Sequence, residues 1–153
     1  MLSKTAEYAL RAVATIARVK EDRPVLAKEI AGQGQIPNKY LSKVMRDLVH
    51  AGVLSSTRGI GGGFRLKRKA DTIKLADVIR PFDDVMASQR CPFGNNRCSD
   101  EYPCSMHEQW KPVSEAVQHL LERTTVADII RGNAPIRLGS EKPRSAKGRK
   151  GRR

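Results

Sequence analysis

Three cysteines and a histidine lie close together in the second half of the chain. Cys91, Cys98, Cys104 and His107 form the pattern C-x6-C-x5-C-x2-H, which gathers four potential metal ligands within seventeen residues. Thiolates favour zinc or iron-sulfur centres, and a neutral imidazole can supply the fourth ligand to either. Structural zinc sites usually contain a tight C-x2-4-C knuckle, which this pattern lacks. The spacing therefore predicts a metal centre with room for a cluster.

Other interpretations of these residues stay open. The cysteines could be three reduced thiols in a loop, or could hold a structural zinc ion in a protein that binds DNA constitutively. Cys104 as nucleophile and His107 as base would make a thiol-dependent enzyme, but no orienting acid or oxyanion motif accompanies them in the sequence. We therefore expect a binding protein rather than an enzyme. The odd number of cysteines and the amphipathic opening residues favour the reducing cytoplasm.

The positive charge of the chain is concentrated in two segments. The net charge is +13; residues 37–69 carry eight basic residues and one acidic residue, and residues 138–153 carry seven and one. The rest of the chain is balanced, so residues 37–69 are expected to form a surface for a polyanion, with nucleic acid ahead of a merely solvated face. The longest stretch without Asp, Glu, Lys or Arg has ten residues, whereas a membrane span needs roughly 20 apolar residues. We expect no membrane span.

Three helices are expected in the first third of the chain. Apolar residues recur at helical spacing over residues 3–19, a short helix is expected over residues 26–31, and a longer one from Pro37 or Asn38 to Ala51. The proline suits a first helical turn and the asparagine a cap. Glycines in left-handed conformations are expected to end the second and third helices: Gly32, Gly34 and Gly52. Short helix, turn and longer helix is the helix-turn-helix order, in which the second helix lies in the major groove.

The third helix is expected to have one basic face and one apolar face. At ~100° per residue, Lys39, Lys43 and Arg46 fall within a wedge of about 60°, flanked by Asn38 and Ser42. The apolar positions lie on the other side: Leu41, Val44, Met45 and Leu48. One face is therefore expected to pack on the core while the other meets DNA.

A winged hairpin is expected next. Residues 53–57 and 64–67 have strand character, and the glycines between them permit a tight turn with Arg58 at its tip. Such an arginine is well placed to enter a minor groove. The glycines match neither phosphate-binding motif, G-x-x-x-x-G-K-[ST] or G-x-G-x-x-G. The expected DNA contacts of helix and hairpin are Asn38, Lys39, Tyr40, Ser42, Lys43, Arg46, Arg58, Gly59, Gly61 and Arg65.

The second half of the chain is expected to be helical after the cysteines. A short helix over residues 73–79 precedes the loop, and Ser105 and Glu108 are expected to form a capping box that opens a helix to Arg123, kinked at Pro112. An apolar seam on this helix suits either the same helix of a second chain or the core of its own chain. Its residues are Trp110, Val113, Val117, Leu120 and Thr124.

The expected fold is mainly α with a small β hairpin, and it divides into four segments. They are a winged helix-turn-helix domain (1–82), a cysteine loop (83–104), a dimerisation helix with a short C-terminal helix (105–137) and a basic disordered tail (138–153).

Five parts of the sequence together resemble the Rrf-type family of winged-helix iron-sulfur transcription regulators. They are TAEYALRA (5–12), IPNKYLSKVMRDLVHAG (36–52), STRGIGGGFRL (56–66), the three loop cysteines and TTVADII (124–130). The resemblance implies a homodimer that binds double-stranded promoter DNA and carries an iron-sulfur cluster in each loop. It makes Cys91, Cys98 and Cys104 the thiolate ligands.

The resemblance leaves two candidates for the fourth ligand. His107 stands where IscR-like members place the histidine of a 2Fe-2S centre, and this is the assignment we favour. Glu7 stands where NsrR-like members place an aspartate that reaches from the partner subunit to a 4Fe-4S centre. The resemblance also implies that cluster status modulates promoter binding in response to iron-sulfur, redox or nitric oxide signals.

Overall fold

The computed structural model describes residues 2–19, 23–83, 93 and 99–132, and these residues are mainly helical with one β hairpin, as the sequence predicts. Cys91, Cys98 and the basic tail lie outside the described residues. The elements in chain order are α1 (Lys4–Arg18), α2 (Ala27–Gly34), α3 (Asn38–His50), β1 (Leu54–Thr57), β2 (Gly63–Leu66), α4 (Leu75–Ile79), α5 (His107–Arg123) and α6 (Val126–Arg131).

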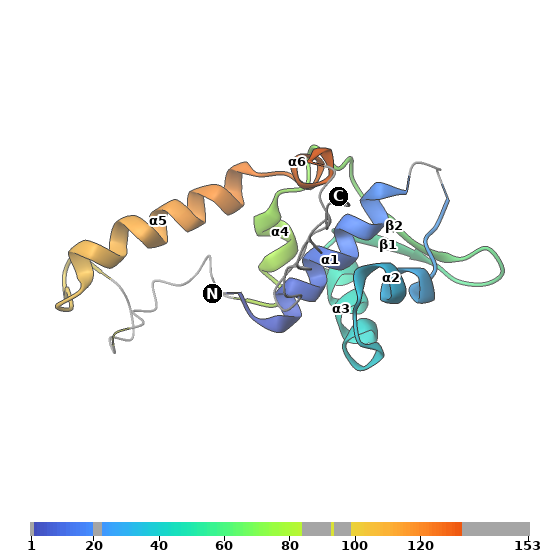
Figure 1. The fold of residues 1–153 in the computed structure, drawn as a ribbon, viewed down its shortest axis with the longest axis horizontal. Helices are drawn as coiled ribbons and strands as arrows, with labels where there is room; N and C mark the ends of the chain where they lie inside the picture. The colour runs from blue at the N-terminus through green and yellow to red at the C-terminus, as the bar shows by residue number, and fades with distance from the viewer. Residues whose placement is uncertain (1, 20–22, 84–92, 94–98, 133–153) are drawn as a thin grey trace, which may run out of the picture.

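Helix α1 lies at the centre of the body and contacts α2, α3, α4, α6 and β2 (Figure 1). It is capped by Ser3, whose hydroxyl accepts a hydrogen bond from the backbone N–H of Ala6 at 3.2 Å. Small side chains on its buried face allow neighbouring helices to approach closely. They include Ala6, Ala9, Ala12 and Ala14.

The turn of the helix-turn-helix differs from the expectation. Helix α2 continues through Gly32 to Gly34, so neither glycine takes a left-handed conformation, and Gln35 does so instead with φ 51°. The Gln35 N–H closes the helix end by donating to the Gly32 carbonyl at 3.3 Å. Gly34 serves packing, because a Cβ there would lie 3.0 Å from Cδ1 of Ile36.

Helix α3 has nearly the expected bounds. Asn38 is its first residue rather than its cap, since Pro37 occupies the capping position with φ −61° and no side chain caps the helix. The expected stop is confirmed, because Gly52 has φ +71°. The helix therefore spans nearly the same residues as the sequence predicts for the second helix of the helix-turn-helix.

The hairpin is an antiparallel pair of strands whose register joins Leu54 to Leu66 and Thr57 to Gly63. Val25 extends it by a short bridge: its N–H donates to the Phe64 carbonyl at 2.9 Å, and the Phe64 N–H donates back at 2.9 Å. The backbone that leads into α2 is thus fixed to strand β2 of the hairpin.

Helices α4 and α5 both begin later than the sequence predicts. Residues 73 and 74 are extended, because Lys74 bridges Thr125 and the Val126 N–H donates to the Ile73 carbonyl at 2.8 Å. Helix α5 begins at His107 without a side-chain cap, so the predicted capping box is wrong. A turn precedes the helix instead, closed by the His107 N–H on the Cys104 carbonyl at 3.0 Å. The helix continues through Pro112.

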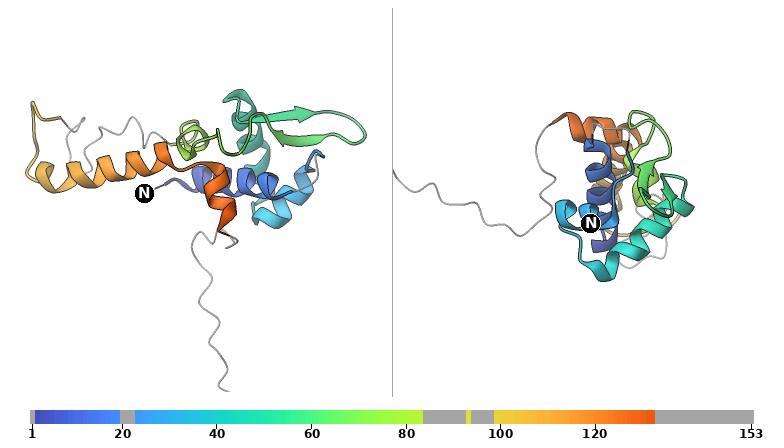
Figure 2. Two further views of the ribbon diagram at one scale, coloured as in Figure 1. Left: turned by 90° about the horizontal axis from the view of Figure 1, so that it is seen from above. Right: turned by 90° about the vertical axis from the view of Figure 1, so that its right-hand side faces the viewer.

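Helix α5 projects from the body like a rod. Its C-terminal end packs near α4, while its N-terminal end lies far from the hairpin at the other end of the molecule (Figures 1 and 2). Among the residues described, no helix combines the length and apolar character needed to cross a bilayer.

Candidate nucleic-acid interface and metal centre

Helix α3 has the two faces that its sequence predicts. The buried residues are Leu41, Val44, Met45 and Leu48. The exposed residues are Asn38, Lys39, Ser42, Lys43 and Arg46. Because packing of the first set on the core holds the helix in place, the second set is presented to solvent as a polar and cationic strip.

One carboxylate moderates the charge of this strip. Asp47 lies beside Lys43, with 3.6 Å between Nζ and Oδ2, and beside Arg46, with 3.4 Å between Nε and Oδ1. Both basic side chains remain mostly exposed, and such surface pairs contribute little to stability. A phosphate can therefore compete for either cation.

Tyr40 differs from the other residues expected to contact DNA. Its side chain is half-buried, and its ring packs against that of Tyr8 on α1. The ammonium of Lys39 lies over the Tyr40 ring, 5.1 Å from its centre. Tyr40 thus links the body to a cation of the exposed strip.

The hairpin holds its tip with glycines in positive-φ conformations. Gly59 has φ +94° and Gly61 has φ +77°, and Arg58 before them is exposed. A Cβ at Gly62 would lie 2.3 Å from the Thr57 carbonyl oxygen, so the turn requires glycine there. Arg65 lies on β2 between Phe64 and Leu66, which pack against the core, so its side chain belongs to the outer face of the hairpin.

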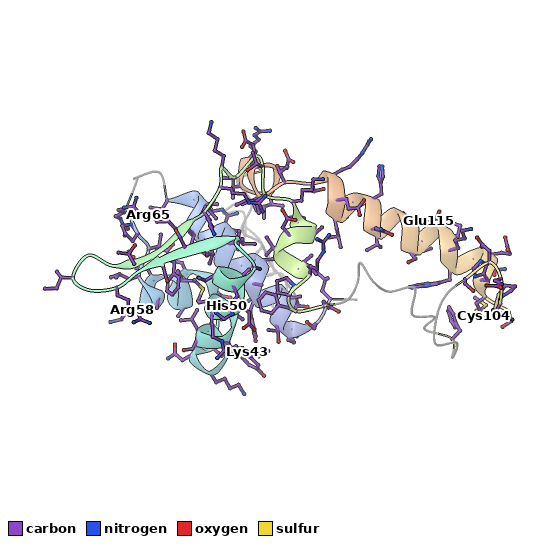
Figure 3. The ribbon with its side chains drawn as sticks, turned by 180° about the vertical axis from the view of Figure 1, so that it is seen from behind. Lys43, His50, Arg58, Arg65, Cys104 and Glu115 are labelled. Carbon is purple, nitrogen blue, oxygen red and sulfur yellow. The ribbon has the colours of Figure 1, made fainter. Side chains whose placement is uncertain are left out.

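Figure 3 shows how these cations are distributed. Lys43 and Arg58 lie toward the same side of the molecule, while Arg65 lies on the other side of the hairpin. Helix α3 and the hairpin therefore present cations on a common surface. The structure brings these two parts of the expected DNA interface to one side of the molecule.

The described part of the expected metal centre lies at the start of α5. Cys104 is half-buried, and the turn that follows it places His107, which is 4% exposed, at the first helical position. Figure 3 shows Cys104 at the end of α5 opposite the hairpin. Across residues 2–19, 23–83, 93 and 99–132, no three His, Cys, Asp or Glu side chains form a metal-binding group.

A carboxylate absent from the sequence prediction contacts His107. Oδ1 of Asp100 lies 2.8 Å from His107 Nε2, and both carboxylate oxygens lie 2.8 Å from Nζ of Lys111. The hydrogen bond from Lys111, followed by that from His107, lowers the pKa of Asp100, and the same carboxylate raises the pKa of Lys111. Asp100 is therefore ionised at neutral pH. No periodicity could have identified it, because the pairing depends on how the turn before α5 folds.

Trp110 adds a second polar group near the same helix end. Its Nε1 atom is buried and has no hydrogen-bond partner within the described part of the chain, and its ring meets that of Phe93 edge-on with 6.0 Å between centres. An unsatisfied buried N–H is costly, and hydrogen bonds to cluster sulfurs are one use for such a donor. A cysteine sulfur, a buried imidazole and a buried N–H near one helix end are groups of the kinds that a metal-sulfur centre uses.

Glu7, the alternative ligand, occupies the first turn of α1. Its carboxylate forms an ion pair with Nζ of Lys4 at 2.8 Å and lies at a helix N-terminus, where negative charge is favourable. The beginnings of α1 and α5 are well separated within one chain (Figure 1). Within one chain, Glu7 therefore lies apart from the start of α5, where Cys104 and His107 lie.

Comparisons with known proteins agree with this fold. The family model of Rrf2, described as an iron-dependent transcriptional regulator, matches residues 2–132. The chain is 36% identical to an HTH-type transcriptional regulator of Aquifex aeolicus, over 85% of this chain and 91% of the relative. It is 32% identical to protein rrf2 of Nitratidesulfovibrio vulgaris, over 85% of this chain and 87% of that protein.

Two solved structures show the same architecture. CymR of B. subtilis, described as the global cysteine regulator, superposes with a TM-score of 0.71 at 25% identity, covering 86% of this chain and 97% of CymR. T. potens IscR superposes with a TM-score of 0.68 at 23% identity, covering 92% and 93% of the two chains. The fold, the exposed cationic helix and the family match lead to one conclusion: the chain belongs to the Rrf2 family of winged-helix transcriptional regulators.

Proposed function

We propose that this regulator binds double-stranded promoter DNA as a homodimer and that an iron-sulfur cluster in its cysteine loop modulates binding. The observation that carries the DNA-binding part is the exposed cationic strip of α3 on a firmly buried apolar face. Lys39, Lys43 and Arg46 contact phosphates. Asn38 and Ser42, on the same exposed face of the helix, donate hydrogen bonds to phosphates or base edges.

The hairpin supplies the second set of contacts. Arg58 enters the minor groove, and the backbone at Gly59 and Gly61 allows close approach to the sugar-phosphate edge. Arg65, on the outer face of the hairpin, contacts backbone phosphate. Tyr40 contributes by holding Lys39 in place, since its own ring is occupied by packing on Tyr8.

The apolar seam of α5 supports dimerisation. Val113, Val117 and Leu120 are 50%, 41% and 59% exposed, although they repeat at helical spacing on one side of a projecting rod. The same helix of a second chain would bury them. We expect sedimentation to show a dimer for the wild-type chain and a monomer for Val117→Asp, with Gln118→Asp as the control of equal charge; a dimer for both variants would contradict the seam.

The cluster part of the proposal is supported by the residues around Cys104. Cys91, Cys98 and Cys104 supply thiolates, and His107 is the favoured fourth ligand of a 2Fe-2S centre; Glu7 of the partner subunit and a 4Fe-4S centre are the alternative. A bound cluster supplies a ligand set that iron supply, oxidation or nitric oxide can change. The buried, carboxylate-paired imidazole beside Cys104 fits this use.

The loop is connected to the DNA-binding body at Asp83. The carboxylate of Asp83 accepts a hydrogen bond from the backbone N–H of Ser3 at 2.5 Å, and Ser3 caps α1, which packs on α3. Cluster binding in the loop can thereby alter the spacing of the two α3 helices of the dimer, which must lie about 34 Å apart to enter successive major grooves. A coupling of ~1 to 3 kcal/mol is sufficient for regulation.

A visible absorption spectrum of anaerobically purified protein, with iron and sulfide determinations, tests this proposal. Bound iron and sulfide with charge-transfer absorption are expected. Zinc alone would support the structural-zinc alternative. Absence of any metal would favour regulation through the thiols themselves, an alternative suggested by the likeness to the cysteine regulator CymR.

A further inference from the structure

Asp100, His107 and Lys111 form a connected group at the start of α5. His107 and Lys111 are one helical turn apart and so lie on the same face of the helix. Asp100 lies across both, with Oδ1 2.8 Å from His107 Nε2 and 2.8 Å from Lys111 Nζ. The imidazole is 4% exposed, whereas the Asp100 side chain is 73% exposed. The exposed Asp100 carboxylate therefore holds the buried His107 ring by a hydrogen bond on its solvent-facing side.

We propose that Asp100 is a positioning residue that orients His107 as a cluster ligand through Nδ1, with Lys111 holding the carboxylate in place. This inference rests on the proposed iron-sulfur function. An ionised carboxylate only accepts hydrogen bonds, so Nε2 of His107 carries the hydrogen and a neutral ring has its lone pair on Nδ1. Metal-binding histidines commonly donate their second N–H to a carboxylate in this way, which fixes ring orientation and raises ligand basicity.

The hydrogen bond between Asp100 and His107 also favours His107 over Glu7 as the fourth cluster ligand. Asp100 and His107 bracket Cys104, and the His107 N–H closes the turn on the Cys104 carbonyl at 3.0 Å. The ring is therefore anchored within one turn of a thiolate ligand. Glu7 lies on a different helix, α1, where its carboxylate is paired with Lys4 of the same helix.

Four variants of the full-length chain test the assignment. Asp100→Asn keeps an oxygen that can accept from Nε2 but removes the charge; Asp100→Ala removes both; Lys111→Met removes the group that holds the carboxylate. Glu108→Gln is the matched control, since Glu108 is exposed beside His107 on the same helix and its loss changes the charge equally. Each protein is reconstituted with iron and sulfide under anaerobic conditions.

Three measurements report on the ligand. Nitrogen-15 labelling of histidine reveals imidazole bound to the reduced cluster by its hyperfine coupling; redox titration gives the midpoint potential; and absorbance decay under chelator gives the rate of cluster loss. We expect coupling in the wild type, in Asp100→Asn and in Glu108→Gln, with a more positive potential in Asp100→Asn than in Glu108→Gln. Asp100→Ala should weaken the coupling and speed cluster loss about 10 to 100-fold, and Lys111→Met should speed it less.

The outcomes separate the two proposals. A wild-type protein that binds no iron and sulfide overturns the cluster function and the inference with it. A wild-type cluster without histidine coupling leaves the cluster function intact and overturns the assignment of His107 and Asp100. Equal coupling, potential and cluster loss in Asp100→Ala and Glu108→Gln would also reject the positioning role.

Discussion

Tyr8 of α1 and Tyr40 of α3 pack ring against ring, with 5.2 Å between their centres and 39° between their planes. The guanidinium of Arg11 lies 5.9 Å from the Tyr8 ring, and Lys39 lies over that of Tyr40. The central helix and the recognition helix are thus joined by a cation-flanked aromatic pair. Such pairs contribute about 0.5–1.5 kcal/mol beyond the area they bury.

The first prediction concerns this pair. Tyr40→Ala should lower the free energy of unfolding by about 2 kcal/mol and weaken DNA binding, because α3 and Lys39 lose their support. Tyr40→Phe should preserve both, since stacking does not need the hydroxyl. Chemical denaturation and DNA titration check the two effects. Lost DNA affinity in a fully stable Tyr40→Phe protein would show that the hydroxyl contacts DNA directly.

Arg58 is predicted to carry specificity. Arg58→Ala should reduce affinity for a selected binding site by roughly tenfold or more and for random duplex by much less, because a minor-groove arginine senses groove width. The control is Arg131→Ala, which removes an exposed arginine of α6, away from α3 and the hairpin, and should leave both affinities unchanged. Equal losses for specific and random DNA would contradict the minor-groove assignment.

Gly63 is predicted to be essential where strand β2 passes the backbone that leads into α2. It has φ +148°, and a Cβ there would lie 2.6 Å from the Val25 carbonyl oxygen, so Gly63→Ala should destabilise the protein by about 1–3 kcal/mol. Gly132→Ala should change stability by less than about 0.5 kcal/mol, because its φ is −69° and none of the described residues comes within 4 Å of its Cβ position. Equal unfolding midpoints for the two variants would contradict this account of the hairpin.

A pH dependence is predicted for the ion pair at the start of α2. Hydrogen bonds from Arg23, and then from the Leu26 N–H, lower the pKa of Glu29 below its ordinary value of 4.5. Because the folded-state pKa is the lower one, the stabilisation is present above pH 4.5 and is lost as the pH falls through the folded-state value. The difference in unfolding free energy between wild type and Glu29→Gln should therefore shrink on acidification. A difference independent of pH would contradict it.

The sequence predicted those parts of the fold that depend on local pattern. The buried and exposed faces of α3 follow from helical periodicity, the stop at Gly52 follows from the need for a left-handed residue, and the hairpin follows from its glycines. Each is determined by residues close together in the chain. These same elements place Lys43 and Arg58 on one surface.

The parts that the sequence did not predict depend on tertiary contacts. Gln35 rather than a glycine turns left-handed, because Gly34 is needed where Ile36 and Thr15 pack closely. Ser105 does not cap α5, because a backbone turn from Cys104 starts the helix later. The contact of Asp100 with His107 likewise depends on the fold of this turn, and not on residue spacing alone.

The most direct test of cluster-controlled DNA binding is a titration of one duplex, selected from random sequence by the protein itself, with cluster-loaded and cluster-free forms of the same preparation. Both forms should bind with a strong dependence on salt, because the proposed interface pairs the lysines and arginine of α3 with phosphates. Their affinities should differ about 5 to 150-fold, which corresponds to a coupling of ~1 to 3 kcal/mol. Equal affinities and equal protected sites for the two forms would contradict control by the cluster.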